Sequence, residues 1–320
     1  MNHSDSGDNA GDGHPAPDTE QAAGPAQADD NEQANDTEQA SGQASGTEQE
    51  SGTEQVGANA GAAGPHSVNL LIEQIGEATG RLLATVAGLT DEQVRADSLL
   101  PGWSRGHVLT HIARNADGLR NLLVWAETGE ETPQYPSLDA RNSQIEEGSG
   151  RSAAELAADL AGSAEAFVTR ARGLPEAAWQ AVVRGSRGPS HPAWFTLHRR
   201  LFEVEVHHAD LALGYQPADW PESFVTEELY RITGDLLGNP RTPAALLTDA
   251  STGRQYFLRA IVESGHDVDA EHADEPGPAS SELAITGPGY LLLAWLLGRD
   301  TGAALEADPA GPLPEIPSYG

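Results

Sequence analysis

Two stretches in the first half of the chain carry apolar residues at the spacing of an amphipathic helix. One runs from Ser67, an expected N-cap, to Gly88, and a short helix capped by Thr90 follows it. The other has Ser104 as its expected N-cap and ends near Thr128. A helical wheel places its apolar positions on one face, and these are Val108, Ile112, Ala116, Leu119, Leu122, Leu123 and Ala126. We therefore expect two long helices, each with a buried side.

Two further long helical patterns follow. Residues 138–172 show helical spacing, interrupted at a glycine-rich point, and residues 191–213 form the last pattern. A short helix is expected at 174–181, with a Gly- and Pro-rich loop after it. Four long helices joined by loops are typical of a four-helix bundle. The pattern thus predicts a bundle over residues 67–218.

The pattern changes after the bundle. Residues 217–238 supply a helix, and residues 243–250 and 254–262 are expected strands around a Ser-Thr-Gly turn. Residues 280–300 have the pattern of a strand, a Gly-Pro-Gly turn and an apolar helix, before a Pro-rich, loose terminus. We expect a small α/β domain over residues 219–320. The fold class is then α+β, with more than one domain.

The first 66 residues differ from the rest. They contain 13 acidic residues, no Lys or Arg, and one large apolar residue beyond Met1, which is Val56. Such a segment buries too little apolar surface to offset the entropy of ordering. We expect residues 1–66 to be a disordered acidic tail.

Charge and composition exclude several classes of protein. The formal net charge of -31 argues against a nucleic-acid-binding protein, because phosphate contacts need a basic face. The absence of cysteine excludes disulfides, thiolate metal ligands and a cysteine nucleophile. All 18 basic residues are arginine, a composition that suggests a GC-rich bacterial genome. No signal peptide and no apolar run of roughly 20 residues is found, so we expect a cytoplasmic protein without membrane spans.

The last bundle helix carries a candidate metal-binding pair. Glu203 and His207 are four residues apart, so one stands a turn above the other on the polar side of the helix, which Asp210 shares. Glu205 and His208 sit beside apolar neighbours and are expected to pack or to support the site. A two-residue spacing is a weak motif, and an exposed Glu–His pair remains the alternative.

His111, on the second long helix, is the candidate third ligand. It borders the apolar stripe of that helix, whereas His107 lies further out; the alternative for His111 is a histidine at the edge of the core. Two nitrogens and one carboxylate oxygen with open positions resemble a catalytic zinc site. Iron, nickel or cobalt would also be accepted by such a set. Asp210 or a backbone carbonyl would orient a ligand from behind.

Several segments carry a family resemblance. These are "LPGWSRGHVLTHIARNADGLRNLLVWAETG", "YPSLDARNSQIEEGSGRSAAELAADLAGSAEAF" and "EVEVHHADLALGY". They resemble the mycothiol-dependent maleylpyruvate isomerase family, whose first domain is a DinB-like metal-binding four-helix bundle. A fourth segment, "LAITGPGYLLLAWLLGRD", is similar to the end of that family's C-terminal domain, an α/β module related to sterol-carrier-like folds. The resemblance spans about residues 67–300.

The resemblance implies a metal site at His111, Glu203 and His207, the three residues that the helical faces favour. It also implies that Arg141 acts near the substrate, and that an arginine of the C-terminal domain contributes to the site. Arg299 and Arg259 are the candidates for that second arginine. The cofactors implied are a divalent metal, zinc foremost, and mycothiol, the low-molecular-weight thiol of actinobacteria.

The implied reaction is the isomerisation of maleylpyruvate to fumarylpyruvate by a metal-activated thiolate. The alternatives are a mycothiol S-transferase acting on another electrophile and a non-catalytic, ligand-binding DinB-like module, because fold and site do not determine the substrate. The expected partners are a small-molecule substrate and the thiol, with no nucleic acid. The expected state is a monomer or a weak homo-oligomer.

Overall fold

The computed structural model describes residues 65–186, 188–237, 239, 241–258 and 283–317. The expected acidic tail lies outside the described residues except for its last two positions. These belong to helix α1 (Pro65–Val86), so the tail was predicted two residues too long, and the helix begins before Ser67, the expected N-cap. Arg259 and the end of the strand expected at 254–262 also lie outside the described residues. In the described residues, no helix is long and apolar enough to cross a membrane.

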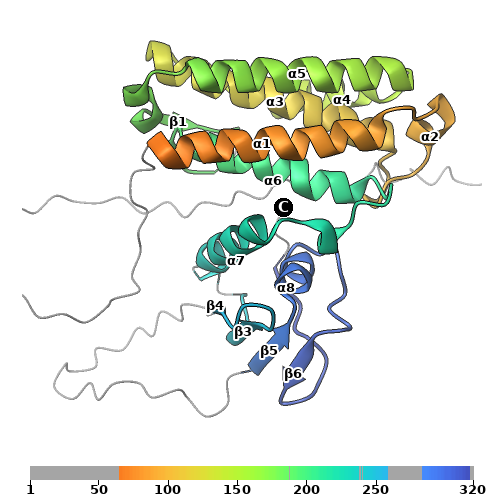
Figure 1. Cartoon of the computed structure of the whole chain (residues 1–320), viewed down its shortest axis with the longest axis vertical. Coiled ribbons are helices and arrows are strands. Elements are labelled where there is room, and N and C mark those ends of the chain that lie inside the picture. Colours follow the sequence, from red (N-terminus) through yellow and green to blue (C-terminus); the bar gives the residue numbers. More distant parts are fainter. Residues whose placement is uncertain (1–64, 187, 238, 240, 259–282, 318–320) are drawn as a thin grey trace, which may run out of the picture.

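The first part of the chain is the expected four-helix bundle. Its long helices are α1 (Pro65–Val86), α3 (Arg105–Thr128), α5 (Ala153–Gly173) and α6 (Phe195–Asp210). Helix α1 packs against α5 and α6, and α3 packs against the same two helices (Figure 1). The apolar faces of all four helices are buried in a continuous core. The bundle of the predicted α+β fold class is therefore confirmed.

Two shorter helices complete this unit. Helix α2 (Asp91–Arg95) precedes α3, and α4 (Leu138–Ser149) packs against α3. The helical pattern expected at 138–172 is thus two helices, α4 and α5, and Ser152 caps the second one. Local capping explains the break, because a Ser-x-x-Glu box starts a new helix after the glycines.

The start of the last bundle helix differs from the expectation. Residues 190–192 form strand β2 (Ser190–Pro192), which pairs antiparallel with β1 (Val182–Arg184), and the helix begins only at Phe195. The expectation of helix from residue 191 was wrong, because a strand of three residues has no periodicity that sequence could show. The short helix expected before this hairpin is the 3-10 helix η1 (Glu176–Gln180).

The second unit is the expected small α/β unit. After the 3-10 helix η2 (Pro217–Asp219) it contains α7 (Glu222–Leu236), β3 (Ala245–Asp249), β4 (Gln255–Leu258), β5 (Leu283–Gly287), α8 (Gly289–Leu296) and β6 (Glu306–Asp308). The strand order is β4-β3-β5-β6, with β3 and β5 parallel and the outer pairs antiparallel. Strand β6 was not foreseen, because the sequence Glu-Ala-Asp before a proline carries no strand signal.

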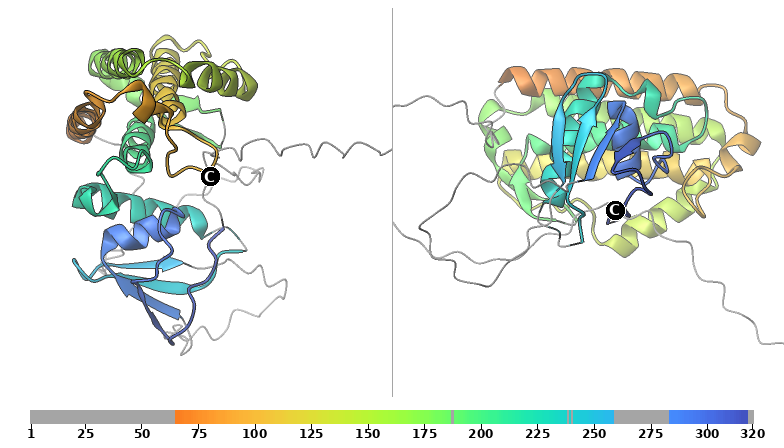
Figure 2. Two further views of the ribbon diagram at one scale, coloured as in Figure 1. Left: turned by 90° about the vertical axis from the view of Figure 1, so that its right-hand side faces the viewer. Right: turned by 90° about the horizontal axis from the view of Figure 1, so that it is seen from below.

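The two units stack on each other. Helices α7 and α8 form a layer between the sheet and the bundle, with α6 facing them (Figures 1 and 2). The helix that carries Glu203 and His207 therefore lies at the junction of the two units. We propose a domain boundary near residue 218, where η2 leads from the bundle into α7.

Candidate metal centre

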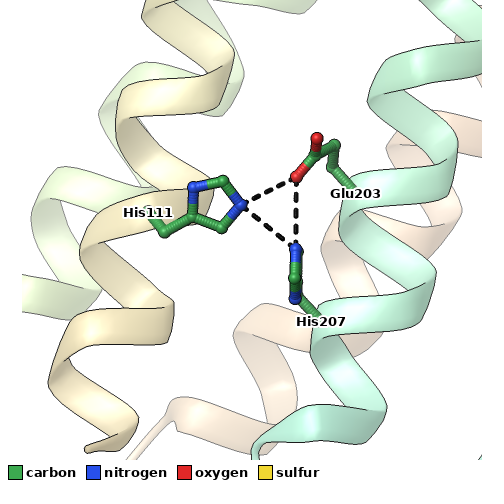
Figure 3. Close-up of side chains that lie close together, drawn as sticks. All are labelled: His111, Glu203 and His207. Atoms are coloured by element: carbon green, nitrogen blue, oxygen red, sulfur yellow. Dashed lines mark hydrogen bonds and ion pairs between the residues drawn. The ribbon is translucent and has the colours of Figure 1, made fainter. Parts of the chain in front are cut away.

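Three buried side chains meet between α3 and α6. His111 comes from α3, and Glu203 and His207 stand one turn apart on α6. The His111 Nε2 atom lies 2.9 Å from Glu203 Oε2 and 3.1 Å from His207 Nε2. The third side of this triangle, from His207 Nε2 to Glu203 Oε2, measures 3.4 Å. Figure 3 shows the three side chains pointing toward one another across the space between the helices.

This triangle fits a divalent metal ion. Ligand atoms about 2.1 Å from a tetrahedral zinc ion lie roughly 3.4 Å apart, close to the separations of these three atoms. Two imidazole nitrogens and a carboxylate oxygen are also the donors that zinc accepts in catalytic sites. In the described residues, this is the one group of three or more such side chains close enough to share an ion.

The neighbouring charges determine the protonation of two of these groups. Burial raises the pKa of the Glu203 carboxyl, but the charges and hydrogen bonds of His111 and His207 outweigh burial and hold that pKa well below its usual value. Burial lowers the pKa of His207, whereas hydrogen bonds to Asp210 and Glu203 raise it to about 9. Glu203 is thus a carboxylate, ready to bind a cation. A metal at His207 has to displace a proton near neutral pH.

Comparison with known proteins identifies a related domain and related solved structures. Residues 75–212 match the family model described as the mycothiol maleylpyruvate isomerase N-terminal domain. A structure described as the crystal structure of the mycothiol-dependent maleylpyruvate isomerase matches with a TM-score of 0.68 and 26% sequence identity, over 79% of this chain and 97% of that chain. Residues 75–212 thus form a domain of this family, and the chain resembles the solved isomerase over most of its length.

A second solved structure, of a histidine-to-alanine mutant of the mycothiol-dependent maleylpyruvate isomerase, matches with the same TM-score and identity. No curated protein matches the chain. The family model covers His111, Glu203, His207 and Arg141, whereas Arg299 lies beyond it and within the second unit.

Asp210 holds the ring of His207 from behind, and Arg299 holds Asp210. His207 Nδ1 lies 2.8 Å from Asp210 Oδ2, and Asp210 in turn accepts hydrogen bonds from Arg299. A carboxylate at Nδ1 keeps the proton there and leaves Nε2 for a metal. Asp210, which was expected to orient a ligand, thus contacts the candidate ligand His207 directly. Arg299 reaches the site through Asp210 rather than by touching the histidines.

Arg141 approaches the other histidine. Its Nη2 atom lies 3.0 Å from His111 Nδ1, and its guanidinium stands 5.9 Å from the centre of the Tyr135 ring. The side chain is buried, although it is charged. The structure therefore brings Arg141 to His111, one of the candidate ligands.

Glu205 and His208 lie on another side of α6. Glu205 pairs with Arg81 of α1, with 2.5 Å between Glu205 Oε1 and Arg81 Nη2, and accepts a hydrogen bond from the Tyr215 hydroxyl. His208 bonds the Thr85 hydroxyl and stacks on the Tyr215 ring. Neither residue contacts the triad. Instead, both connect α6 with α1 and with Tyr215, in the segment that follows α6.

One buried residue near the site was assigned no role from the sequence. Arg200, on the polar side of α6, is fully buried and donates through Nη1 to Ile112 O at 2.8 Å and to Asn115 Oδ1 at 3.0 Å. Its position, one turn before Glu203 on the same face, was the only available signal. Spacing on one helix does not tell which arginines point inward, because a bundle helix also has an outer face.

Proposed function

We propose that this protein is a metal- and mycothiol-dependent maleylpyruvate isomerase. The observation that carries the proposal is the buried triangle of His111, Glu203 and His207 in a domain of this family. We propose zinc as the metal, held by these three side chains with a position left for a further ligand. When bound, such an ion lowers the pKa of a thiol placed on it and so supplies a thiolate at neutral pH.

The thiol has to come from outside the protein. The chain contains no cysteine, so none of its own side chains can serve as the nucleophile. The family's thiol is mycothiol, and we propose it here as the cofactor. A metal held by the triad would bind the sulfur of mycothiol, and other side chains of the protein would bind the substrate.

The reaction needs no oxidant and no net proton transfer. The thiolate sulfur adds to one carbon of the cis double bond of maleylpyruvate, and the displaced electron pair moves into the conjugated carbonyl. The former double bond is now a single bond, and the adduct rotates about it. Expulsion of the thiolate returns the electron pair and leaves the trans double bond of fumarylpyruvate.

Arg141 is the proposed substrate-binding residue. A guanidinium only donates hydrogen bonds, so its contact with His111 requires Nδ1 as the acceptor. A metal on His111 Nε2 would place the proton on Nδ1 instead, and the arginine would then lose this acceptor. Its planar pair of N–H groups would be available to a substrate carboxylate, for which a guanidinium is well matched.

Two measurements test the proposal. Purified protein should contain close to one equivalent of metal, and under ~0.2 equivalents would count against any metalloenzyme. The absorbance change from maleylpyruvate to fumarylpyruvate should depend on added mycothiol and should vanish in His111→Ala. Conjugation of mycothiol to a generic electrophile, without any isomerisation, would identify an S-transferase instead. If the metal-loaded protein shows neither activity, only a ligand-binding role remains.

A further inference from the structure

Arg200 carries its charge in the interior of the bundle. Its side chain is fully buried, and only Nη1 is used, in the two hydrogen bonds to α3. Its Nε and Nη2 atoms are buried and have no hydrogen-bond partner in the described residues. A buried charge is costly unless it is paired and its donors are satisfied. The contact between α6 and α3 uses only Nη1, so it does not explain why Nε and Nη2 are buried as well.

The guanidinium stands beside the candidate metal centre. On α3 it bonds the carbonyl of Ile112, the residue after His111, and the side chain of Asn115, one turn further along. On α6 it belongs to the turn before Glu203. Burial lowers the pKa of Arg200 to about 10, with the Glu203 charge acting in the opposite direction, so the group remains charged at neutral pH. Glu203 Oε2 is occupied by the two histidines.

The same region contains the second buried arginine. The guanidinium of Arg141 stands near the Tyr135 ring, and the Tyr135 hydroxyl is one of the groups whose charge acts on Arg200. Two guanidinium groups thus approach the triad from α4 and α6. Together they add two positive charges to the interior of a chain whose formal net charge is -31. A dianion needs such local compensation, because the overall field of the protein repels it.

We propose that Arg200 is a second carboxylate-binding residue of this site. Its Nε–H and Nη2–H groups form the planar fork that binds a carboxylate with two parallel hydrogen bonds. With Arg141 on one carboxylate and Arg200 on the other, the site selects dicarboxylates over monocarboxylates. This inference rests on the proposed function, because it assigns the second carboxylate of the same substrate.

Equilibrium binding tests the inference without turnover. The full chain is loaded with zinc and titrated calorimetrically with heptanedioate, an unreactive dicarboxylate of the same carbon-chain length as maleylpyruvate, and with heptanoate, its monocarboxylate match. We expect heptanedioate to bind wild type at least about 10-fold more tightly than heptanoate, since a charged hydrogen-bonded pair contributes that much or more. Equal affinities in wild type would overturn the proposal, even if every substituted protein fails to fold.

Two variants distinguish a role of Arg200 in ligand binding from a role in holding α6 against α3. Arg200→Lys keeps the charge and loses the fork, so heptanedioate affinity should fall by about 10- to 100-fold while heptanoate affinity and zinc content stay near wild type. Leu119→Ala removes a buried apolar side chain of α3 and none of the hydrogen bonds of Arg200, so it should lower the melting temperature and leave heptanedioate affinity unchanged. The proposal is wrong if Arg200→Lys binds heptanedioate like wild type, or if Leu119→Ala loses as much affinity as Arg200→Lys.

The outcome is independent of the isomerase assay. Heptanedioate binding that depends on Arg200, together with no thiol-dependent isomerisation by wild type, would reject the proposed reaction and keep the dicarboxylate site. Isomerisation by wild type, with an unchanged KM in Arg200→Lys, would keep the reaction and reject the role of Arg200.

Discussion

Arg299 of the α/β unit forms a two-point contact with Asp210 of the bundle. Arg299 Nη2 lies 3.1 Å from Asp210 Oδ2, and Arg299 Nε lies 3.3 Å from Asp210 Oδ1. The same Asp210 Oδ2 atom lies 2.8 Å from His207 Nδ1. One carboxylate therefore links the second unit to a candidate metal ligand.

Asp210→Asn should weaken metal binding. The neutral amide orients the His207 ring less firmly and no longer balances its charge, and loss of such a supporting group typically reduces metal affinity by about 10- to 100-fold. Competition with a chromophoric zinc chelator measures the change. Asp139→Asn, at an exposed position of α4, is the matched control and should bind zinc like wild type. Equal zinc affinities for all three proteins would contradict the role of Asp210.

Arg299→Ala should destabilise the protein more than Arg299→Lys does. Asp210 is buried, so removal of the guanidinium leaves its carboxylate with His207 as its remaining charged partner, an effect on the order of 2 kcal/mol in the free energy of unfolding. Lysine keeps the charge and should recover part of that loss. Urea unfolding of the zinc-free proteins measures both values. Identical stabilities for alanine, lysine and wild type would show that the contact contributes nothing.

His111→Ala should abolish stoichiometric metal binding, whereas His107→Ala should not. Both histidines lie on α3, but His107 faces Glu146 and the N-cap Ser104 rather than the triad. Losing one of three ligands should leave under ~0.2 equivalents of zinc after dialysis. Loss of the cap contact in His107→Ala should cost about 1 kcal/mol of stability and no metal. Elemental analysis measures the zinc content of both variants. A full equivalent of zinc in His111→Ala would show that His111 is not a metal ligand.

His198 should make the protein less stable in mild acid. Burial, and to a smaller degree the Arg231 charge, lowers the pKa of His198 from 6.5 to about 4. Between these values the unfolded chain binds a proton that the folded protein does not, so the free energy of unfolding falls as the pH falls from 6.5 toward 4. Above pH 6.5 this contribution vanishes.

The expected loss from His198 is on the order of 1–3 kcal/mol. Urea unfolding at pH 7 and at pH 4.5 should therefore show a smaller drop in stability for His198→Gln than for wild type. The comparison cancels the carboxylates that titrate in the same range in both proteins. An equal drop in the two proteins would mean that His198 takes up its proton in the folded state as readily as in the unfolded one.

Much of the helical unit follows from local sequence. Ser104 and Thr128 bound α3 as expected, because the capping box of Ser104 and the left-handed Gly129 are features of a few consecutive residues. The pairing of Glu203 with His207 follows from helix geometry alone, since four residues make about one turn. The hairpin of β1 and β2 was missed because its strands are too short to show a period.

The choice of His111 over His107 came from the apolar stripe of one helix, and the structure places His111 against the residues of α6. The contacts of Arg200 with Asn115 and of Arg299 with Asp210 join residues 85 and 89 positions apart. No local pattern encodes which of 18 arginines is buried, because burial depends on how α3 packs against α6 and on how the segment after α8 meets the bundle. Short-range periodicity and capping thus determined the helices and the candidate ligands, whereas only the tertiary packing decided which charges surround them.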